Sequence, residues 1–525
     1  MEYYVSVCLI AVAAMLTVAN SLPMLKILQL SGYKARGVIA WWKGSAYDVI
    51  VRYCSLMLFG FITTIIYVGC FSVYEYARYC AVALYIILQT VFIFAARKNG
   101  GSAVKLTARM VRLMATEAVI ALGLGALVAW ACYCNVYCQT LVAALALLTP
   151  AAVFAANFIT APFEKLNNKK YVKRAKAKLD ASKPTVIGIT GSCGKTTAKN
   201  ILRAMLDNKY TVLTTPGNYN TPLGISRTVN DSLGNEKIFI AELGARYSGD
   251  IKELCDIVSP RYGIITAIGD MHLETFGSRE KIADAKFELG NALPQDGLLV
   301  LNGYNERCKA LASRATSCEK RVTGETARTA FSGVTLGGNG TGFTLTLDGK
   351  EYGVTTVLLG AHIPELVCCC AEIALELGVL PEQIVSAVES MPAVEHRLQI
   401  LPSADPDVTV IDDAYNSNPI GAKNALDVIS GMDGKKIIIT PGFVELGAIE
   451  KECNRTLGAQ VAEVCDYAFF VGSRAADLKK GAVKAGMNEG VITEASSRDE
   501  AVKALSGITG KRVVLFENDL PDNIK

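Results

Sequence analysis

Long, nearly uninterrupted apolar runs occupy the first third of the chain, whereas the remainder alternates short apolar runs with amphipathic stretches. Five of the long runs approach or reach the roughly 17–25 residues that a helix needs to cross a bilayer. They lie at Val5–Leu22, Ser55–Phe71, Tyr79–Ala95, Ala118–Tyr133 and Thr140–Ile159. The pattern therefore predicts an all-α bundle of five transmembrane helices.

Basic residues between these runs set the expected orientation. The loop at 23–54 carries five Lys/Arg and the loop at 96–117 carries five more, whereas the other two loops contain only Arg78. Positive loops face the cytoplasm, so we expect the N-terminus outside and the long C-terminal part inside, where ATP is available. The first run lacks the basic start of a signal peptide, so we expect it to stay attached.

Beyond residue 184, short runs of β type alternate with longer stretches of helix type. This alternation is typical of a mostly parallel sheet that helices cover. One series has β-type runs at 237–241, 262–268 and 297–301, with helix-type stretches at 278–293 and 363–377. A second series has β-type runs at 407–412, 435–440, 467–471 and 512–516. Two such series predict two consecutive α/β domains that meet near residue 395.

The segment Pro184–Thr197, P-T-V-I-G-I-T-G-S-C-G-K-T-T, joins an apolar β-type run to a helix-like stretch through a turn with two glycines. Backbone N–H groups at such a turn can cradle phosphates, with Lys195 reaching the terminal ones and Thr196 binding Mg²⁺. The strict phosphate-loop template is incomplete because Ile189 stands where it requires glycine, and a plain strand–turn–helix is the alternative. The expected nucleotide contacts are Gly191, Ser192, Cys193, Gly194, Lys195, Thr196 and Thr197.

Together these patterns divide the chain into four parts. We expect a membrane domain over 1–162, a basic juxtamembrane linker over 163–183, a P-loop-type ATPase domain over 184–395 and a Rossmann-like α/β domain over 396–525. Between residues 163 and 179 seven Lys/Arg accompany one Glu. This linker is either a solvated helix or a contact for anionic lipid headgroups, at about 1 kcal/mol per cation.

Composition excludes several other functions. The 525 residues are 51% hydrophobic, which is high for a soluble protein. The part after residue 165 is close to neutral, so no nucleic-acid partner is expected. The 16 cysteines show no paired C-x-x-C spacing suited to zinc, and Cys368–Cys370 are expected to be small core residues.

Polar residues that follow apolar runs mark the ligand-binding edge of a parallel sheet. Glu242 follows one run beside the phosphate loop and suits a second Mg²⁺ ligand, although a solvated strand end is the alternative. Asp270-Met271-His272 follows another run. Asp412-Asp413 could bind ribose hydroxyls or a cation, or only form a turn. Lys286 lies near an apolar helix face, where a lysine is usually a surface residue.

Several motifs in a specific order resemble the Mur ligases, the ATP-dependent enzymes of peptidoglycan synthesis, over residues 184–525. All three histidines fall inside these motifs. The motifs are T-G-S-C-G-K-T-T (190–197), G-N-Y-N-T-P-L-G (217–224), A-E-L-G-A (241–245), I-G-D-M-H-L-E-T-F-G-S (268–278), A-K-F-E-L (285–289), L-L-G-A-H (358–362), E-H-R-L (395–398), I-D-D-A-Y-N-S-N-P (411–419) and T-P-G-F-V-E-L-G (440–447).

The resemblance implies ATP and Mg²⁺ as cofactors and assigns roles to individual residues. Lys195 and Thr196 would hold the phosphates and a first Mg²⁺, which Glu242 shares. His272 and a carbamylated Lys286 would serve a second metal. The remaining implied nucleotide contacts are Arg397 at the γ-phosphate, Asp413 at the ribose, and Asn218.

The resemblance also implies a reaction. ATP phosphorylates a carboxylate to an acyl phosphate, an amine attacks the activated carbonyl, and an amide forms as phosphate leaves. Among Mur ligases the motifs are most similar to those that add D-alanyl-D-alanine to a muramoyl-tripeptide. We therefore expect a multi-pass ligase of a bacterial cell membrane, with the lipid bilayer, a wall precursor and an amine as partners.

Other readings stay open at this point. A membrane-bound poly-γ-glutamate-type ligase is the nearest enzyme alternative, and a nucleotide-driven transporter or sensor and a noncatalytic scaffold are alternatives of other classes. The chain also departs from the family. Ala267, Ile363 and Leu366 stand where members usually have Asn, which implies altered adenine contacts, and membrane spans replace the usual UDP-sugar-binding domain.

Overall fold

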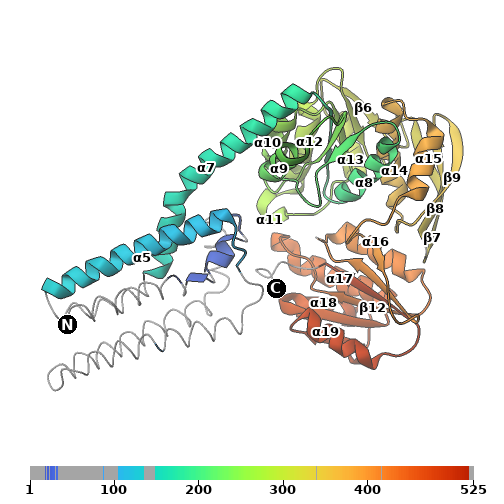
Figure 1. Cartoon of the computed structure of the whole chain (residues 1–525). Helices are drawn as coiled ribbons and strands as arrows, with labels where there is room; N and C mark the ends of the chain where they lie inside the picture. The colour runs from blue at the N-terminus through green and yellow to red at the C-terminus, as the bar shows by residue number, and fades with distance from the viewer. Residues whose placement is uncertain are drawn as a thin grey trace. The chain divides into compact units, whose positions relative to one another are not determined.

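The computed structural model describes residues 18, 21–22, 24–29, 31–33, 87, 104–134, 148–338, 340–415 and 417–518. The chain divides into two compact units, Met1–Lys169 and Lys170–Lys525. The boundary between the units falls inside helix α7 (Thr149–Ser182), which is drawn with the other elements in Figure 1.

The first unit contains α5 (Ala108–Cys134) and the first part of α7. Their contact is apolar, and Arg112 Nε on α5 also donates to Glu164 Oε1 on α7 at 2.6 Å. The buried apolar residues of this contact are Met24, Leu25, Ile27, Leu28, Met110, Leu113, Val153 and Ala156. Apolar packing thus joins the described segments of this unit.

Among the residues that the structure describes, one helix is long and apolar enough to cross a membrane, Ala108–Val128 within α5. It overlaps the fourth predicted span, 118–133. The predicted span at 55–71 lies outside the described residues, as do most of 5–22 and 79–95 and the start of 140–159. The described part of the chain therefore contains one candidate span where the sequence predicts five.

The predicted linker 163–183 continues α7 as helix almost to its end. Its last turns are packed, because Leu179 is buried in the core of the second unit and Lys176 Nζ donates to the Asp256 carbonyl at 2.8 Å. This part of the linker is a docked helix, whereas the residues before it on the same helix are mostly exposed.

The central sheet of the second unit has six parallel strands in the order β2-β3-β1-β4-β5-β6. The strands are β1 (Thr185–Thr190), β2 (Val212–Thr214), β3 (Ile238–Glu242), β4 (Tyr262–Ile265), β5 (Leu298–Leu301) and β6 (Glu319–Val322). Helices cover both faces of this sheet, which explains why its inner strands are almost continuously apolar.

The two faces of the central sheet carry different helices. One face packs α8 (Lys195–Asp207), α14 (Ile363–Glu376) and α15 (Pro381–Ser390). The opposite face packs α9 (Pro222–Ser232), α10 (Asp250–Val258) and α12 (Arg279–Ala292). The short elements of this part are α11 (Leu273–Phe276), α13 (Glu306–Lys309) and the 3₁₀ turn η2 (Ala310–Ser313). Cys368–Cys370 on α14 are fully buried, so the prediction of core cysteines is confirmed.

A three-stranded antiparallel sheet follows, which the sequence analysis did not predict. It consists of β7 (Thr329–Gly337), β8 (Gly340–Leu347) and β9 (Lys350–Thr356). Alternate residues of β8 are buried, and Asp348-Gly349 forms the turn to β9 with φ of 48° and 81°. An Asp-Gly pair between alternating runs is the usual signal of a tight hairpin, and it was present in the sequence.

The C-terminal sheet has the order β10-β11-β15-β12-β13-β14, and only β10 is antiparallel to its neighbour. Its strands are β10 (Gln399–Leu401), β11 (Val408–Asp413), β12 (Lys435–Thr440), β13 (Tyr467–Val471), β14 (Ile492–Ala495) and β15 (Arg512–Glu517). This second parallel sheet, like the first, agrees with the predicted α/β class.

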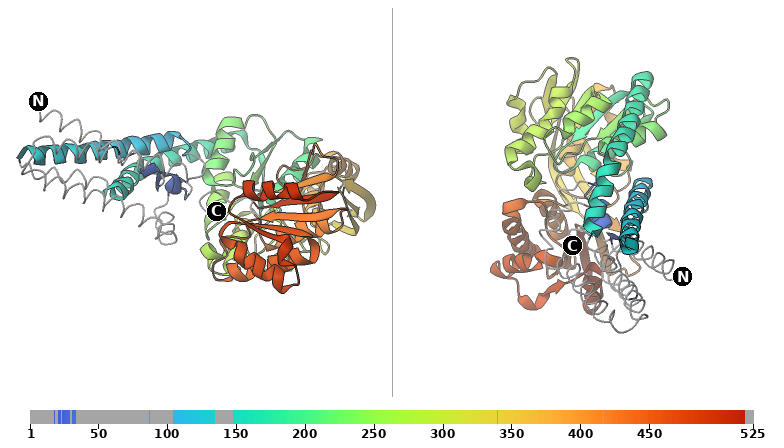
Figure 2. Two further views of the ribbon diagram at one scale, coloured as in Figure 1. Left: turned by 90° about the horizontal axis from the view of Figure 1, so that it is seen from below. Right: turned by 90° about the vertical axis from the view of Figure 1, so that its left-hand side faces the viewer.

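Helices lie on both faces of the C-terminal sheet, as the left view of Figure 2 shows. One face packs α16 (Pro419–Ser430), α17 (Glu450–Val464) and α18 (Ala475–Lys484), and the other packs α19 (Arg498–Ala504). Short 3₁₀ turns complete this part: η3 (Gly447–Ile449), η4 (Gly472–Arg474), η5 (Glu489–Val491) and η6 (Leu505–Gly507).

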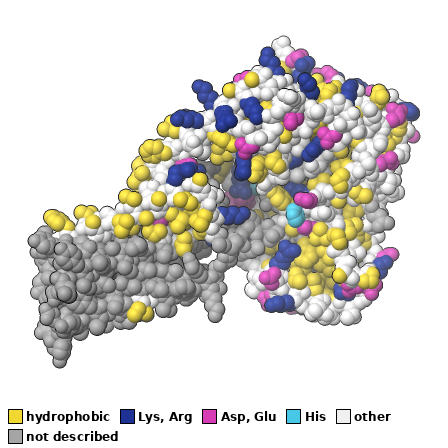
Figure 3. Space-filling model, viewed as in Figure 1, with side chains coloured by type: hydrophobic (Ala, Val, Ile, Leu, Met, Phe, Trp, Pro, Cys, Tyr) yellow, Lys and Arg dark blue, Asp and Glu magenta, His cyan; other side chains and the backbone are white. Residues whose placement is uncertain are grey.

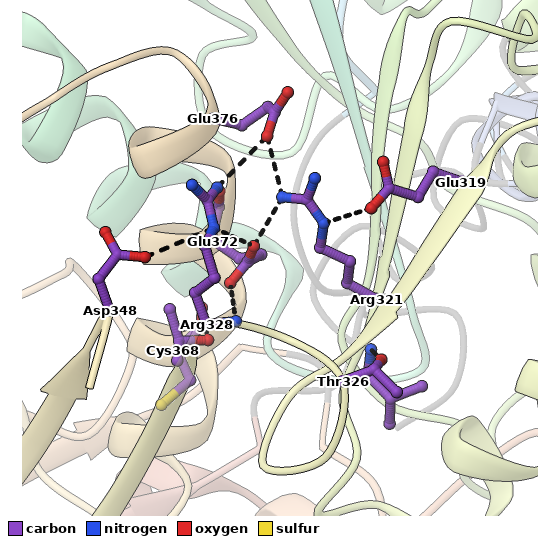
Figure 4. Close-up of polar contacts among 10 residues, drawn as sticks. Glu319, Arg321, Thr326, Arg328, Asp348, Cys368, Glu372 and Glu376 are labelled. Carbon is purple, nitrogen blue, oxygen red and sulfur yellow. Dashed lines mark hydrogen bonds and ion pairs between the residues drawn. The ribbon is translucent and has the colours of Figure 1, made fainter.

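A buried charge network attaches α14 to the strands beside it (Figure 4). Glu372 Oε1 accepts from Arg321 at 2.8 Å and from Arg328 at 3.0 Å, while Glu372 Oε2 accepts the backbone N–H of Arg328 at 2.8 Å. Glu376, one turn later, contacts both guanidinium groups at 2.9 and 3.3 Å. The network matters for the site because the other end of α14 packs against the phosphate loop.

We predict that Glu372→Ala lowers the free energy of unfolding by about 3–5 kcal/mol, because it leaves two arginines without their buried partner. Glu376→Ala is the matched control in the same network. Its side chain is 33% exposed, against 0% for Glu372, so we expect it to cost no more than about 1 kcal/mol. Urea denaturation followed by circular dichroism measures both variants, and equal midpoints would contradict the prediction.

Candidate active site

The phosphate loop 191–194 connects β1 to α8 and has little room for side chains. A Cβ on Gly191 would lie 2.0 Å from Thr266 Oγ1, and Gly194 has a φ of +78°, so both positions favour glycine. Ser192 N donates to the Ala267 carbonyl at 2.8 Å, which ties the loop to the segment after β4. The loop is therefore held in one shape by its neighbours.

Helix α8 begins at Lys195, and no side chain caps its first N–H groups. Free N–H groups at a helix start attract anions. Lys195 Nζ donates to the Gly191 carbonyl at 2.7 Å, which folds its ammonium back over the loop. Burial lowers the pKa of Lys195, and the carboxylate of Glu242 opposes that shift. This arrangement suits phosphate groups, as the sequence predicted.

Thr196 and Glu242 meet directly beside this loop. Thr196 Oγ1 donates to Glu242 Oε2 at 3.0 Å, and Asn220 Nδ2 donates to Glu242 Oε1 at 3.1 Å. A hydroxyl and a carboxylate are oxygen donors of the kind that Mg²⁺ prefers. The residues present therefore fit a magnesium ion, with Thr196 and Glu242 as the groups that would hold it.

Lys199 is part of this cluster and was missed by the sequence analysis. Its ammonium is 2% exposed and donates to Glu242 Oε2 at 3.2 Å and to the carbonyls of Thr215 and Gly217, both at 2.7 Å. It thus ties α8, β3 and the loop after β2 together. The available signal was its position one helical turn after Lys195, on the face that carries the apolar residues of α8.

Lys286 lies on α12 and is 4% exposed. The sequence pattern alone favoured a surface lysine at this position, and that interpretation is wrong. Burial, followed by the charge of Lys195, lowers the pKa of Lys286 to about 7. A lysine with this pKa is largely neutral in mildly alkaline solution. Its nitrogen then has a free lone pair, which an ordinary lysine lacks.

His272 precedes α11 and has a left-handed backbone, with φ of 53°. Its Nδ1 contacts the carboxylate of Glu445, a residue of the segment after β12, and Arg246 contacts the same carboxylate at 3.3 Å. Burial lowers the pKa of His272 despite the opposing effect of Glu445. The ring is therefore neutral near pH 7 and can act as a ligand through one nitrogen.

The segment 395–398 joins the two sheets and carries Arg397. The guanidinium carbon of Arg397 lies 4.4 Å from the centroid of the Tyr415 ring. Leu398 N donates to Asp413 Oδ1 at 3.2 Å, and burial raises the pKa of Asp413 to about 6. The charge of Arg397 also lowers the pKa of Lys195.

Not every predicted residue is brought into the cluster by a direct contact. A hydrogen bond joins Thr196 to Glu242, and Lys195 precedes Thr196 in the chain. Lys286 and Arg397 are related to Lys195 only through the effects of charge on pKa. Of the other predicted nucleotide contacts, Asn218 is exposed, Thr197 is buried in α8, and Asp413 contacts the 395–398 segment.

Two of the three departures from the family pattern, Ala267 and Leu366, lie against the phosphate loop. Ala267, Ile363 and Leu366 are all buried, and Leu366 reaches within 3.0 Å of the place where a Cβ on Gly194 would stand. Burial raises the pKa of the Cys193 thiol to about 11, so Cys193 is protonated at neutral pH. Apolar groups therefore line the loop on the side of α14.

Comparisons with known proteins place this site in a family. The model of the Mur ligase middle domain matches residues 189–371, and that of the Mur ligase glutamate ligase domain matches 396–517. The UDP-N-acetylmuramoyl-tripeptide–D-alanyl-D-alanine ligase of Bacillus subtilis is 31% identical over 59% of this chain and 67% of its own. The Mycobacterium tuberculosis enzyme of that name is 36% identical over 48% of this chain and 50% of its own.

Comparison with solved structures also finds Mur ligases. A crystal structure of MurF from Acinetobacter baumannii has a TM-score of 0.60 and 26% identity, and the match covers 67% of this chain and 77% of that one. The Thermotoga maritima MurF ligase in complex with ADP has a TM-score of 0.59 at 24% identity over 67% and 80%, which is a likeness of fold. The chain spans about half to two thirds of the curated relatives named above. The predicted family is confirmed: the chain belongs to the Mur ligases, which are ATP- and Mg²⁺-dependent carbon–nitrogen ligases.

Proposed function

We propose that the chain forms an amide bond between a carboxylate activated by ATP and an incoming amine, and that these substrates are a muramoyl-tripeptide wall precursor and D-alanyl-D-alanine. The observation that carries the proposal is the Thr196–Glu242 pair beside the phosphate loop, together with the ammonium of Lys195, which donates to the Gly191 carbonyl of that loop. The named relatives support the choice of substrates, because their names specify this tripeptide and this dipeptide.

The charges of the site suit the reaction. The γ-phosphate, the substrate carboxylate and the acyl phosphate are anionic, so their approach needs cations. Lys195 and Arg397 supply two of these, and a Mg²⁺ held by Thr196 and Glu242 supplies further positive charge when bound. Asp413, beside Arg397, would take the ribose. Each of these roles is a proposal that individual variants can test.

We also propose that this ligase works at a membrane, with its soluble domains on the cytoplasmic side. The described helices of the first unit expose large apolar side chains, as Figure 3 shows beside the grey atoms. Phe158 on α7 is 82% exposed and Trp130 on α5 is 67% exposed. Further along α7, exposed Lys169, Lys170 and Lys173 suit anionic headgroups. Release of the chain by a carbonate wash of membranes would contradict this placement.

The experiment that tests the function is phosphate release from ATP by the purified full chain. The reactions contain UDP-N-acetylmuramoyl-tripeptide with D-alanyl-D-alanine, each of these alone, glutamate, or no acceptor. We expect release only when tripeptide and dipeptide are both present. Release with glutamate alone would favour a poly-γ-glutamate-type ligase, and release without any acceptor would favour a nucleotide-driven transporter. Release that persists at the wild-type rate with Lys195→Ala would contradict the assignment of Lys195 to the phosphate site.

A further inference from the structure

The motif T-P-G-F-V-E-L-G at 440–447 contains a glutamate that reaches from one α/β domain into the other. Glu445 follows β12 of the C-terminal sheet, whereas its three partners belong to the central domain. Its carboxylate contacts His272 Nδ1 and Arg246 Nη1, the latter at 3.3 Å, and its backbone carbonyl accepts from Glu274 N at 3.1 Å. Both the side chain and the backbone of Glu445 thus connect this motif to the segments of the central domain that carry Arg246, His272 and Glu274.

Both members of the His272–Glu445 contact have a left-handed backbone, with φ of 53° and 61°. Such a conformation is unfavourable for a non-glycine residue and persists only where the surroundings impose it. Here two such residues contact each other. They are 173 positions apart in sequence and belong to different domains. The surroundings of the contact therefore impose this conformation on both of its residues.

The chemistry of the pair determines which nitrogen of the ring is free. Arg246 Nη1 lies 3.3 Å from the carboxylate that His272 Nδ1 contacts, and this neighbouring cation favours the ionised form of Glu445. An ionised carboxylate only accepts hydrogen bonds, so Nδ1 of a neutral His272 carries the proton. The lone pair then resides on Nε2. A carboxylate behind a histidine is the usual arrangement that orients a metal-binding imidazole.

We propose that Glu445 is a positioning residue which fixes the tautomer of His272, so that Nε2 can bind a divalent cation only when the C-terminal domain is docked on the central domain. The inference rests on the proposed function in one respect, namely that the site takes a metal–nucleotide complex. Docking of the two domains and completion of the metal site then become one event, because the residue that orients the ligand belongs to the other domain.

The test uses the full chain and its three histidines, His272, His362 and His396. With ¹⁵N-labelled histidine, long-range ¹H–¹⁵N spectra distinguish a ring protonated at Nδ1 from one protonated at Nε2. His362→Gln and His396→Gln assign the signals. Binding of Mn²⁺ in the presence of ADP is measured in parallel, from the paramagnetic resonance of the free ion.

In the wild type we expect the Nδ1–H tautomer at His272. Glu445→Ala should populate the Nε2–H tautomer and weaken Mn²⁺ binding about tenfold. Glu450→Ala is the matched control, because Glu450 pairs with Arg474 at 2.9 Å inside the C-terminal domain. It should leave the tautomer unchanged and Mn²⁺ binding within twofold. Glu445→Gln retains an acceptor oxygen and should keep the Nδ1–H tautomer. This variant tests the inference if Glu445→Ala does not fold.

An unchanged tautomer in Glu445→Ala, or a changed tautomer with unchanged Mn²⁺ binding, would overturn the inference. A change of the tautomer in Glu445→Gln would overturn it as well. A wild type that binds neither Mn²⁺ nor ADP would overturn the proposed function itself. Binding in the wild type that Glu445→Ala does not alter would leave the proposed function intact and reject the role of Glu445 alone.

Discussion

Lys195→Ala should lower kcat for acceptor-dependent phosphate release by about 10²–10³-fold, because it removes a preorganised cation from the place where phosphate charge develops. Lys195 Nζ lies over the phosphate loop, 2.7 Å from the Gly191 carbonyl, and the uncapped start of α8 points at the same place. No other residue of the loop can replace its charge, since the loop otherwise consists of Gly, Ser and Cys.

The protein should remain folded when Lys195 is replaced. Burial lowers the pKa of Lys195, which means that its charged form is not favoured by its surroundings. Lys209→Ala is a suitable control, because Lys209 also donates to two backbone carbonyls, at 2.6 and 3.1 Å, but outside the site. We expect unchanged turnover for this control. Circular dichroism should be the same for both variants, and turnover by Lys195→Ala near the wild-type rate would contradict the assignment.

Lys286→Ala should lower kcat about 100-fold or more, because it removes the group that carbamylation would convert from a cation into an anion. The lone pair of a neutral lysine attacks CO₂, the nitrogen loses a proton to solvent, and an anionic carbamate results. Such an anion could orient a second metal. With a pKa of about 7, Lys286 is mostly neutral above that pH and mostly protonated below it.

Two further measurements separate this role from simple packing. Wild-type activity should rise with pH through about 7 and fall when CO₂ is removed, because both changes control how much carbamate forms. Acetate should restore part of the activity of Lys286→Ala by supplying a carboxylate in the vacated space. Lys281→Ala, on the exposed side of α12, should behave as the wild type in both tests. Activity that is independent of CO₂ would reject the carbamate.

The α/β class, most of the parallel strands and the family were predictable from the chain alone, whereas β2, β6, β10 and β14 were not predicted. Strands such as β1 and β3 are buried on both faces, so they read as continuous apolar runs, and the turn at Gly191 and Gly194 leaves a local signature. The phosphate loop, Thr196 and Glu242 were predictable because they lie at the carboxyl ends of strands β1 and β3, where a parallel sheet binds ligands. Apolar runs and glycine turns are local signals, because each involves only residues that are close together in the sequence.

Contacts between residues far apart in the chain could be read only from the folded structure. The sheet β7–β9 was overlooked because its strands alternate between buried and partly exposed positions, within a chain dominated by parallel β/α units with continuous apolar runs. Whether Lys286 is buried or exposed depends on what packs against α12, and the residues alone favoured exposure. Lys199 and Glu445 act through partners that are 43 and 173 residues away, respectively. Such contacts follow from the docking of whole elements, which no local pattern specifies.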